Sequence, residues 1–370
     1  MPTDARLTRR ALLSAMSGVI VAAQSAGRAQ SAGRAQSGSV VAPEFKRYAD
    51  AATENPVTRL TDPAHISLLP AWHLSAATRR GHALLYSNDR TGQMQAYRMD
   101  LKSGESRQLT GADPVRPLAV ALLPDERFFA CLAGRALTVQ QMKPARPRVV
   151  YSVPDEFEPT DGLSVSHDGA LAFLVEKNAT TWRLRQVPLA RAGAATTVVE
   201  SAVELHDPMV RPGGNEVLYR ETGNEMRLAP GSRLLTTAAG PDIWSPDGAT
   251  VLYLSIPADP AQPNTIRVFD MATGQDSLVS KTSRFVSFGR NADASVFVGA
   301  SASKASPSVL LLLRSVRREL TLCEHRASDP ALVAPRFTPD SQRILFQSDK
   351  NGGMAIYAVN VERFVEETGA

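Results

Sequence analysis

The sequence predicts an all-β fold: a seven-bladed β-propeller whose last blade is closed by an N-terminal strand. Two observations carry this prediction, a Pro-Asp-Gly type of turn that recurs seven times and a run of β-forming residues after each turn. The composition agrees, because 24 Gly and 25 Pro in 370 residues suit many short strands joined by tight turns.

The repeated turn is clearest at residues 245–248, 338–341 and 166–169, and weaker copies complete the set. The third residue of each turn marks the repeat: Arg80, Asp125, Asp168, Gly213, Asp247, Asp293 and Asp340. The markers lie 43 to 47 residues apart, except for one step of 34 residues. A four-stranded blade takes about 40–50 residues, so the spacing predicts seven blades, one of them trimmed. A β-sandwich is the alternative, and the even period disfavours it.

The remaining strands of the blades follow each repeat. Residues 95–110 and 265–279 both read as strand, turn and strand. The last strand, at 355–361, lacks an outer partner, whereas residues 57–61 form a spare strand before the first repeat. We expect this spare strand to close the last blade, because closure removes an open sheet edge.

Residues 1–36 are expected to be a twin-arginine type of signal and a low-complexity linker, with the propeller at 37–370. Arg9 and Arg10 precede an apolar run at 15–23, and residues 24–29 repeat at 30–35. The apolar run is too short to span a bilayer stably. The prediction is therefore a periplasmic or secreted protein with no stable membrane span in its mature form.

The charge balance outside this segment is even. Residues 1–36 hold five arginines and one aspartate, which leaves 36 basic and 36 acidic residues in the rest of the chain. No basic face argues for a nucleic-acid partner. Cys131 and Cys323 lie in apolar strand-like runs, where two unlinked thiols are favoured over a disulfide, although the sequence leaves both open.

Candidate catalytic residues are few. The sequence lacks a lipase-type elbow, a phosphate loop, a dinucleotide fingerprint and a His-Glu-x-x-His motif. Among six histidines, His206 is the best candidate for a proton acceptor or donor, and Arg211 could grip a carboxylate. His206 and Arg211 are five residues apart around the start of a predicted strand, so both could face the central funnel. The alternatives are that His206 is a structural histidine and that Arg211 pairs with a neighbouring blade.

Residues 57–362 resemble the oligogalacturonate lyase family. The similarity rests on residues 57–61, 205–212, 243–248, 335–340 and 345–357, while turns of the Ser-Asp-x-x-Gly type are shared with TolB-like propellers. The resemblance implies a seven-bladed propeller that cleaves pectin-derived galacturonides by β-elimination. It also implies a manganese ion that grips the uronate carboxylate while a base removes the C5 proton.

The sequence departs from this family at the metal. The positions of the family's metal ligands fall on Ser287, Asp329, Leu332 and Ala334, and a further family histidine falls on Pro241. Manganese is expected from the family, but its histidine ligands are absent, so no metal site is predicted. Arg284, Arg227 and Asp329 are the predicted substrate-binding residues, with Arg220 as a further candidate grip.

Two functional hypotheses follow. The first is an oligogalacturonate lyase-like propeller that binds acidic, uronate-containing oligosaccharides and, if active, is a carbon–oxygen lyase with His206 and Arg211 as catalytic residues. The alternative is a non-catalytic, TolB-like periplasmic propeller that binds protein or glycan. Fold alone does not separate them, because propellers host many functions.

Overall fold

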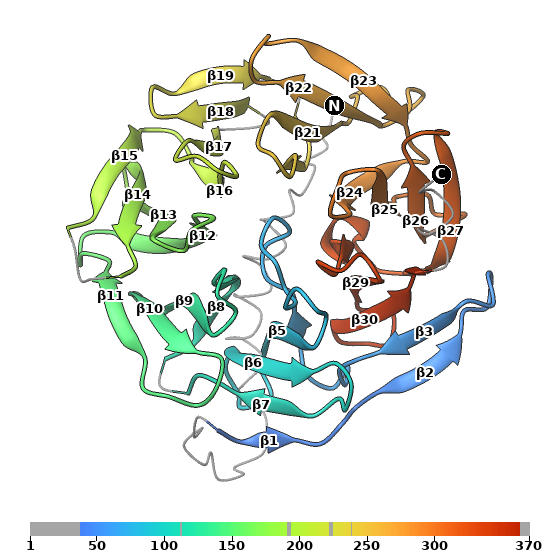
Figure 1. Ribbon diagram of the computed structural model, residues 1–370, viewed down its shortest axis with the longest axis horizontal. Helices are drawn as coiled ribbons and strands as arrows, with labels where there is room; N and C mark the ends of the chain where they lie inside the picture. The colour runs from blue at the N-terminus through green and yellow to red at the C-terminus, as the bar shows by residue number, and fades with distance from the viewer. Residues whose placement is uncertain (1–37, 112, 191–193, 222–224, 238, 363–370) are drawn as a thin grey trace, which may run out of the picture. The chain divides into compact units, whose positions relative to one another are not determined.

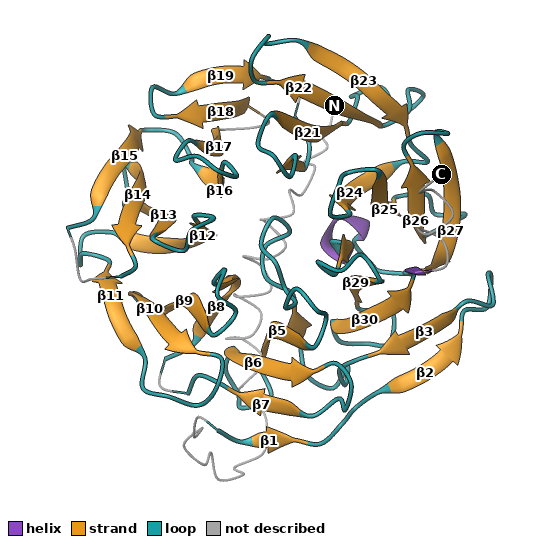
Figure 2. Cartoon of the chain, viewed as in Figure 1, coloured by secondary structure: helices purple, strands orange, loops and turns teal. Residues whose placement is uncertain are grey.

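The computed structural model describes residues 38–362 apart from 112, 191–193, 222–224 and 238. Seven antiparallel sheets are arranged in a ring (Figure 1), which confirms the predicted seven-bladed propeller. Apart from the short η1 helix, Pro330–Val333, and a helical residue at 362, the described residues form strands and loops (Figure 2). The predicted segment 1–36 lies outside the described residues.

The strands of the first four blades follow one another in chain order. Blade 1 holds β4 (Ser67–Leu68), β5 (Ala83–Asn88), β6 (Gln95–Asp100) and β7 (Ser106–Gln108). Blade 2 holds β8 (Val115–Leu122), β9 (Phe128–Ala133), β10 (Ala136–Gln141) and β11 (Arg148–Ser152). Blade 3 holds β12 (Glu158–Val165), β13 (Leu171–Lys177), β14 (Trp182–Pro188) and β15 (Thr196–Ser201). Blade 4 is the trimmed one, with β16 (His206–Val210), β17 (Val217–Glu221), β18 (Glu225–Ala229) and β19 (Arg233–Thr236).

The last three blades complete the ring. Blade 5 holds β20 (Asp242–Trp244), β21 (Thr250–Ser255), β22 (Thr265–Asp270) and β23 (Asp276–Lys281). Blade 6 holds β24 (Phe285–Arg290), β25 (Val296–Ser301), β26 (Ser308–Leu313) and β27 (Arg318–Glu324). Blade 7 holds β28 (Arg336–Phe337), β29 (Arg343–Ser348) and β30 (Ala355–Asn360), and is completed by β3 (Pro56–Arg59).

The closure of blade 7 by β3 confirms the prediction made for residues 57–61. Val57 pairs with Val359 and is fully buried. The N-terminal segment adds two strands that the sequence did not indicate: β2 (Lys46–Ala49) lies outside β3, and β1 (Val40–Val41) lies outside β7. The same stretch of chain therefore borders both blade 7 and blade 1, where the ring closes (Figure 1).

The interior is built from one recurring feature. The second strand of every blade buries an aromatic side chain with less than 2% exposed, a set made up of Tyr86, Phe129, Phe173, Tyr219, Tyr253, Phe297 and Phe346. These rings pack between neighbouring sheets, where each removes a large apolar area from water. Cys131 in blade 2 and Cys323 in blade 6 are buried free thiols. Burial raises the pKa of Cys131 to about 11 and that of Cys323 to about 12.

The loop between β4 and β5, residues 69–77, reaches the centre of the ring, and we call it the plug loop (Figure 1). Its backbone and side chains bond to blades on several sides. Ala71 N–H donates to Leu118 of blade 2 at 3.1 Å, and Leu69 N–H donates to the Gln347 side chain of blade 7 at 2.9 Å. The plug loop therefore joins blade 1 to strands of blades 2 and 7 that are remote in sequence.

Candidate active site

The inner strands carry register irregularities that re-aim their side chains. These occur in β8, β12, β16 and β24, each between the start and the middle of the strand. A bulge of this kind leaves residues unpaired and turns their side chains away from the regular alternation. In β16 the irregularity lies between His206 and Met209, so the side chains at the start of this strand depart from the regular alternation.

His206 and Asp207 form a hydrogen-bonded pair at the start of β16. His206 Nδ1 lies 2.8 Å from Asp207 Oδ2, and the two side chains are 19% and 31% exposed. Because a carboxylate accepts hydrogen bonds, Nδ1–H is the donor and Nε2 is left unprotonated in the neutral ring. Asp207 has a φ of 53°, a left-handed conformation that non-glycine residues adopt at a cost and that is often found at functional sites. The pair has the form of a general base held by a carboxylate.

A buried ion pair stands next to this dyad. Arg220, the β-ladder partner of His206, contacts Asp242 at 2.7 Å, and the side chains are 7% and 3% exposed. Arg220 also donates to the carbonyls of Ala239 and Gly240. Burial opposes its charge, but Asp242 and then Asp207 outweigh it and raise the pKa of Arg220. Burial raises the pKa of Asp242, and Arg220 counters that rise.

The plug loop brings His73 to the same place. His73 Nε2 lies 3.0 Å from the carbonyl of Leu163 on β12, and this carbonyl can only accept, so Nε2 carries the proton. Its Nδ1 is buried and has no hydrogen-bond partner among the described residues. Burial lowers the pKa of His73, and the carboxylates of Asp207 and Asp242 act in the opposite direction. We call His73, His206, Asp207, Arg220 and Asp242 the axial cluster.

A further cation lies on the neighbouring inner strands. Arg116 on β8 stands 3.8 Å from Asp161 on β12, and the side chains are 36% and 37% exposed. The separation exceeds a hydrogen bond, and Arg116 Nε is buried with no partner among the described residues. The Arg116 guanidinium therefore has an N–H donor at Nε that no described residue uses. Sequence patterns do not distinguish Arg116, Asp161 or Asp207, because only the packing of blades 2, 3 and 4 against one another places β8, β12 and β16 side by side.

Arg211 is separated from His206 by the length of β16. It follows the strand's last residue, and its Nε donates to the Gly248 carbonyl of blade 5 at 2.8 Å. The guanidinium also pairs with Glu216 and lies 5.7 Å from the centre of the Trp244 ring. The structure therefore gives Arg211 the alternative role weighed from the sequence, a link to the neighbouring blade. The reason is that five residues of extended chain separate two ends of a strand rather than two groups at one end.

The three predicted substrate-binding residues do not gather in one place. Exposed Arg284 precedes β24, and its side chain donates to the Pro260 carbonyl at 3.3 Å. Asp329 caps η1 by accepting the Ala331 N–H at 2.9 Å. Arg227 lies on β18, the third strand of blade 4, where it pairs with Glu221 at 2.7 Å and Glu225 at 2.8 Å. Arg227 is thus separated from the inner strands by a whole strand.

The positions at which the resemblance implies metal ligands do not fit a metal here. Leu332 and Ala334 are buried and apolar, and the Ser287 side chain bonds to the Pro330 carbonyl. Asp329 remains as a single carboxylate, already engaged as a cap. Among the residues that the structure describes, no three His, Cys, Asp or Glu side chains are grouped so as to hold a metal ion. We therefore assign no chemical step to a metal.

The sequence of the chain is similar to those of two proteins named as lyases. No family model matches the chain. An oligogalacturonide lyase of Pectobacterium atrosepticum is 24% identical over 382 residues, which cover 88% of this chain and 98% of the relative. An oligogalacturonate lyase of Dickeya dadantii is 23% identical, with 86% and 96% covered.

Solved structures agree with the sequence relatives. An oligogalacturonate lyase in complex with manganese has a TM-score of 0.80 at 23% identity, and covers 88% of this chain and 98% of its own. The Vibrio parahaemolyticus oligogalacturonate lyase has a TM-score of 0.78 at 22% identity, with the same coverage. In sequence and in fold, the chain is therefore similar to oligogalacturonate lyases, and it shares their fold.

Proposed function

We propose that this protein binds uronate-containing, pectin-derived oligosaccharides at the axial cluster and cleaves them by β-elimination. The observation that carries the proposal is the His206–Asp207 dyad, in which the carboxylate contacts Nδ1, at the start of an inner strand in a propeller similar to oligogalacturonate lyases. Two relatives named as lyases, which this chain matches over 98% and 96% of their lengths, support the same reaction class.

The chain's own residues supply each part of the reaction. Arg116 would face the uronate carboxylate, since a guanidinium matches a carboxylate in two-point fashion and stays charged. His206 Nε2 would take the C5 proton while a C4–C5 double bond forms and the C4–oxygen bond breaks. Asp207 would stabilise the imidazolium, which returns its proton to the departing oxygen.

The test is to incubate purified protein with digalacturonate, with manganese or with a chelator, and to follow the absorbance of the unsaturated product. We expect product under both conditions. His206→Gln should lower kcat by about 10²-fold or more, whereas His167→Gln, at an exposed turn histidine, should leave it unchanged. Absence of product under every condition would overturn the lyase proposal.

A second candidate function is binding without cleavage, as in the non-catalytic propeller weighed from the sequence. The observation that favours it is that Leu332 and Ala334 are buried and apolar at positions where the resemblance implies metal ligands. Calorimetry with digalacturonate separates the two: heat of binding without unsaturated product supports this candidate, and product formation excludes it.

Export to the periplasm or beyond is part of the proposal, and it is supported by Arg9, Arg10 and the apolar run after them. Cell fractionation is the measurement. A variant with both arginines replaced by lysine should remain in the cytoplasm, whereas Arg28→Lys should be exported like the unmodified chain. Equal export of all three would contradict a twin-arginine signal.

A further inference from the structure

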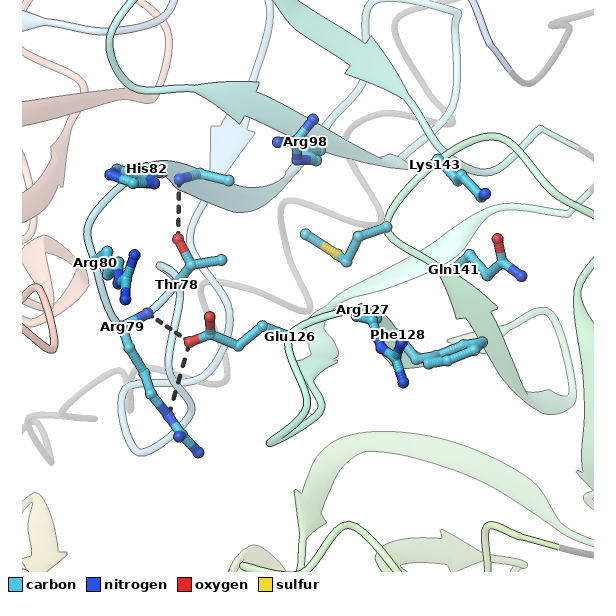
Figure 3. A pocket seen from close by; sticks show the side chains of 12 residues that line it. Thr78, Arg79, Arg80, His82, Arg98, Glu126, Arg127, Phe128, Gln141 and Lys143 are labelled. Carbon is cyan, nitrogen blue, oxygen red and sulfur yellow. Dashed lines mark hydrogen bonds and ion pairs between the residues drawn. The ribbon is translucent and has the colours of Figure 1, made fainter.

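A cavity of about 870 Å³ opens between blades 1 and 2, at the end of the blades that carries the repeated turns. Its walls come from both blades (Figure 3): the turn at 78–80 and Arg98 on β6 from blade 1, and Arg127, Phe128 and Lys143 from blade 2. The axial cluster lies at the opposite ends of the inner strands, where those strands begin. The cavity is therefore a separate feature of the molecule.

The lining of this cavity is strongly basic. Five arginine or lysine side chains and one histidine face a single acidic one, namely Arg79, Arg80, Arg98, Arg127, Lys143 and His82 against Glu126. Cations gathered around one concave space attract an anionic ligand and raise its local concentration. In a chain whose charges balance outside residues 1–36, this gathering is a local arrangement.

Among the basic residues of the cavity, Arg79 bonds to blade 2, whereas others have side chains that make no such contact with any described residue. Glu126 accepts the Arg79 backbone N–H at 2.5 Å, and the Arg79 guanidinium donates to the Pro124 carbonyl at 3.1 Å. These two hydrogen bonds connect the repeated turn of blade 1 to that of blade 2. Within the described part of the chain, no hydrogen bond or ion pair engages the side chains of Arg80, Arg127 or Lys143, and all three are exposed. Their donors are available to a ligand.

The cavity also has an apolar component. Phe128 is half-buried, Met142 is buried, and Gln141 adds an amide beside them. The cations come from one turn and one strand of blade 1 and from two segments of blade 2 around this patch (Figure 3). Such spacing suits carboxylates distributed along an oligomer with apolar ring faces between them, rather than one compact anion.

We infer that this cavity is a second glycan site, which binds an acidic oligosaccharide through its carboxylates. The inference stands on the cavity's own residues and does not require the axial cluster to be catalytic. A site of this kind would hold one part of a polyuronate chain on the protein, at a distance from the inner-strand cluster.

The test uses the full chain and calorimetry with hexagalacturonate. Arg80→Glu combined with Arg127→Glu should weaken binding at this site by at least about tenfold, because each lost charge-assisted contact is worth roughly that factor. The matched control is Lys304→Glu combined with Arg318→Glu, exposed positions on blade 6 with the same change of charge. The control should bind like the unmodified protein.

Two further ligands distinguish a polyuronate site from a general sugar site or a general anion site. Maltohexaose, which is neutral, should not bind at the cavity, and inorganic phosphate should not displace hexagalacturonate at equal concentration. Unchanged affinity in the Arg80/Arg127 variant, or equal loss in the blade 6 control, would overturn the inference. Digalacturonate cleavage is measured on the same variants. We expect the cavity substitutions to leave cleavage unchanged. If the unmodified protein does not cleave digalacturonate, the proposed lyase function fails, but the binding result still tests the cavity.

Discussion

His325 shows how a single buried side chain makes stability depend on pH. Its Nδ1 accepts the Ala327 N–H and its Nε2 donates to the Ser301 carbonyl, both at 3.0 Å, so the neutral ring satisfies both bonds. Burial lowers the pKa of His325 below the ordinary 6.5. Protonation of Nδ1 would remove the acceptor that Ala327 requires.

The sign of the effect follows from linkage. Since the folded chain holds His325 neutral while the unfolded chain takes up a proton near pH 6.5, this stabilisation is complete above pH 6.5 and is lost as pH falls through the folded-state pKa. Urea unfolding should show that the free energy of unfolding of the unmodified protein is lower at pH 5.5 than at pH 7.5, and that this difference is smaller in His325→Gln. His167→Gln should retain the full drop, and an equal drop in all three proteins would contradict the role of His325.

The buried Arg220–Asp242 pair predicts a non-additive response. Arg220→Met leaves the Asp242 carboxylate buried without its cation, which should cost about 3–5 kcal/mol of unfolding free energy. Combining it with Asp242→Leu removes the stranded charge and should recover much of the loss. Chemical denaturation of the single and double variants measures this, and a double variant less stable than Arg220→Met would contradict the prediction.

At the scale of the element, a glycine in β25 makes room for an aromatic ring of the inner strand. A Cβ added at Gly299 would stand 2.1 Å from the ring of Phe285, a fully buried residue of β24. Gly299→Ala should therefore lower the free energy of unfolding by about 1–3 kcal/mol through overpacking. Gly274→Ser serves as the contrast, because no atom lies within 4 Å of that position and only its positive φ resists substitution.

The turn motif illustrates what local sequence can and cannot predict. Pro-Asp-Gly turns such as 245–248 form because Asp247 accepts the N–H of Ala249 and the hydroxyl of Ser245, with Gly248 at a φ of 69°. These contacts span five residues, so they were readable from the sequence. Gly248 also packs against Arg211 and Pro212 of the preceding blade. This contact could not be predicted from the sequence, because it depends on how the sheets stack.

At the scale of the whole molecule, the ring is held shut by the N-terminal strands. A chain that begins at residue 62 would lack β1, β2 and β3, which leaves the β30 edge unpaired and removes Val57 from the core. We expect this chain to lose cooperative thermal unfolding and to aggregate through the open edge. A chain that begins at residue 38 keeps all described strands and should unfold cooperatively; indistinguishable melting of the two would contradict this account.

The number of blades and the closing strand were predictable because both depend on short-range chemistry repeated along the chain. Turns, β-forming runs and an unpaired strand at each end were visible in the sequence, and β3 pairs with β30 as expected. The candidate site was only partly predictable. His206 and Arg220 were named as candidates, and Asp207 directly follows His206 in the chain. The Arg220–Asp242 pair and the approach of His73 depend on how neighbouring blades and the plug loop pack together, which the sequence does not show. The spacing of His206 and Arg211 could not reveal that β16 holds them apart, because position along a strand says nothing of which neighbouring blade each end will touch.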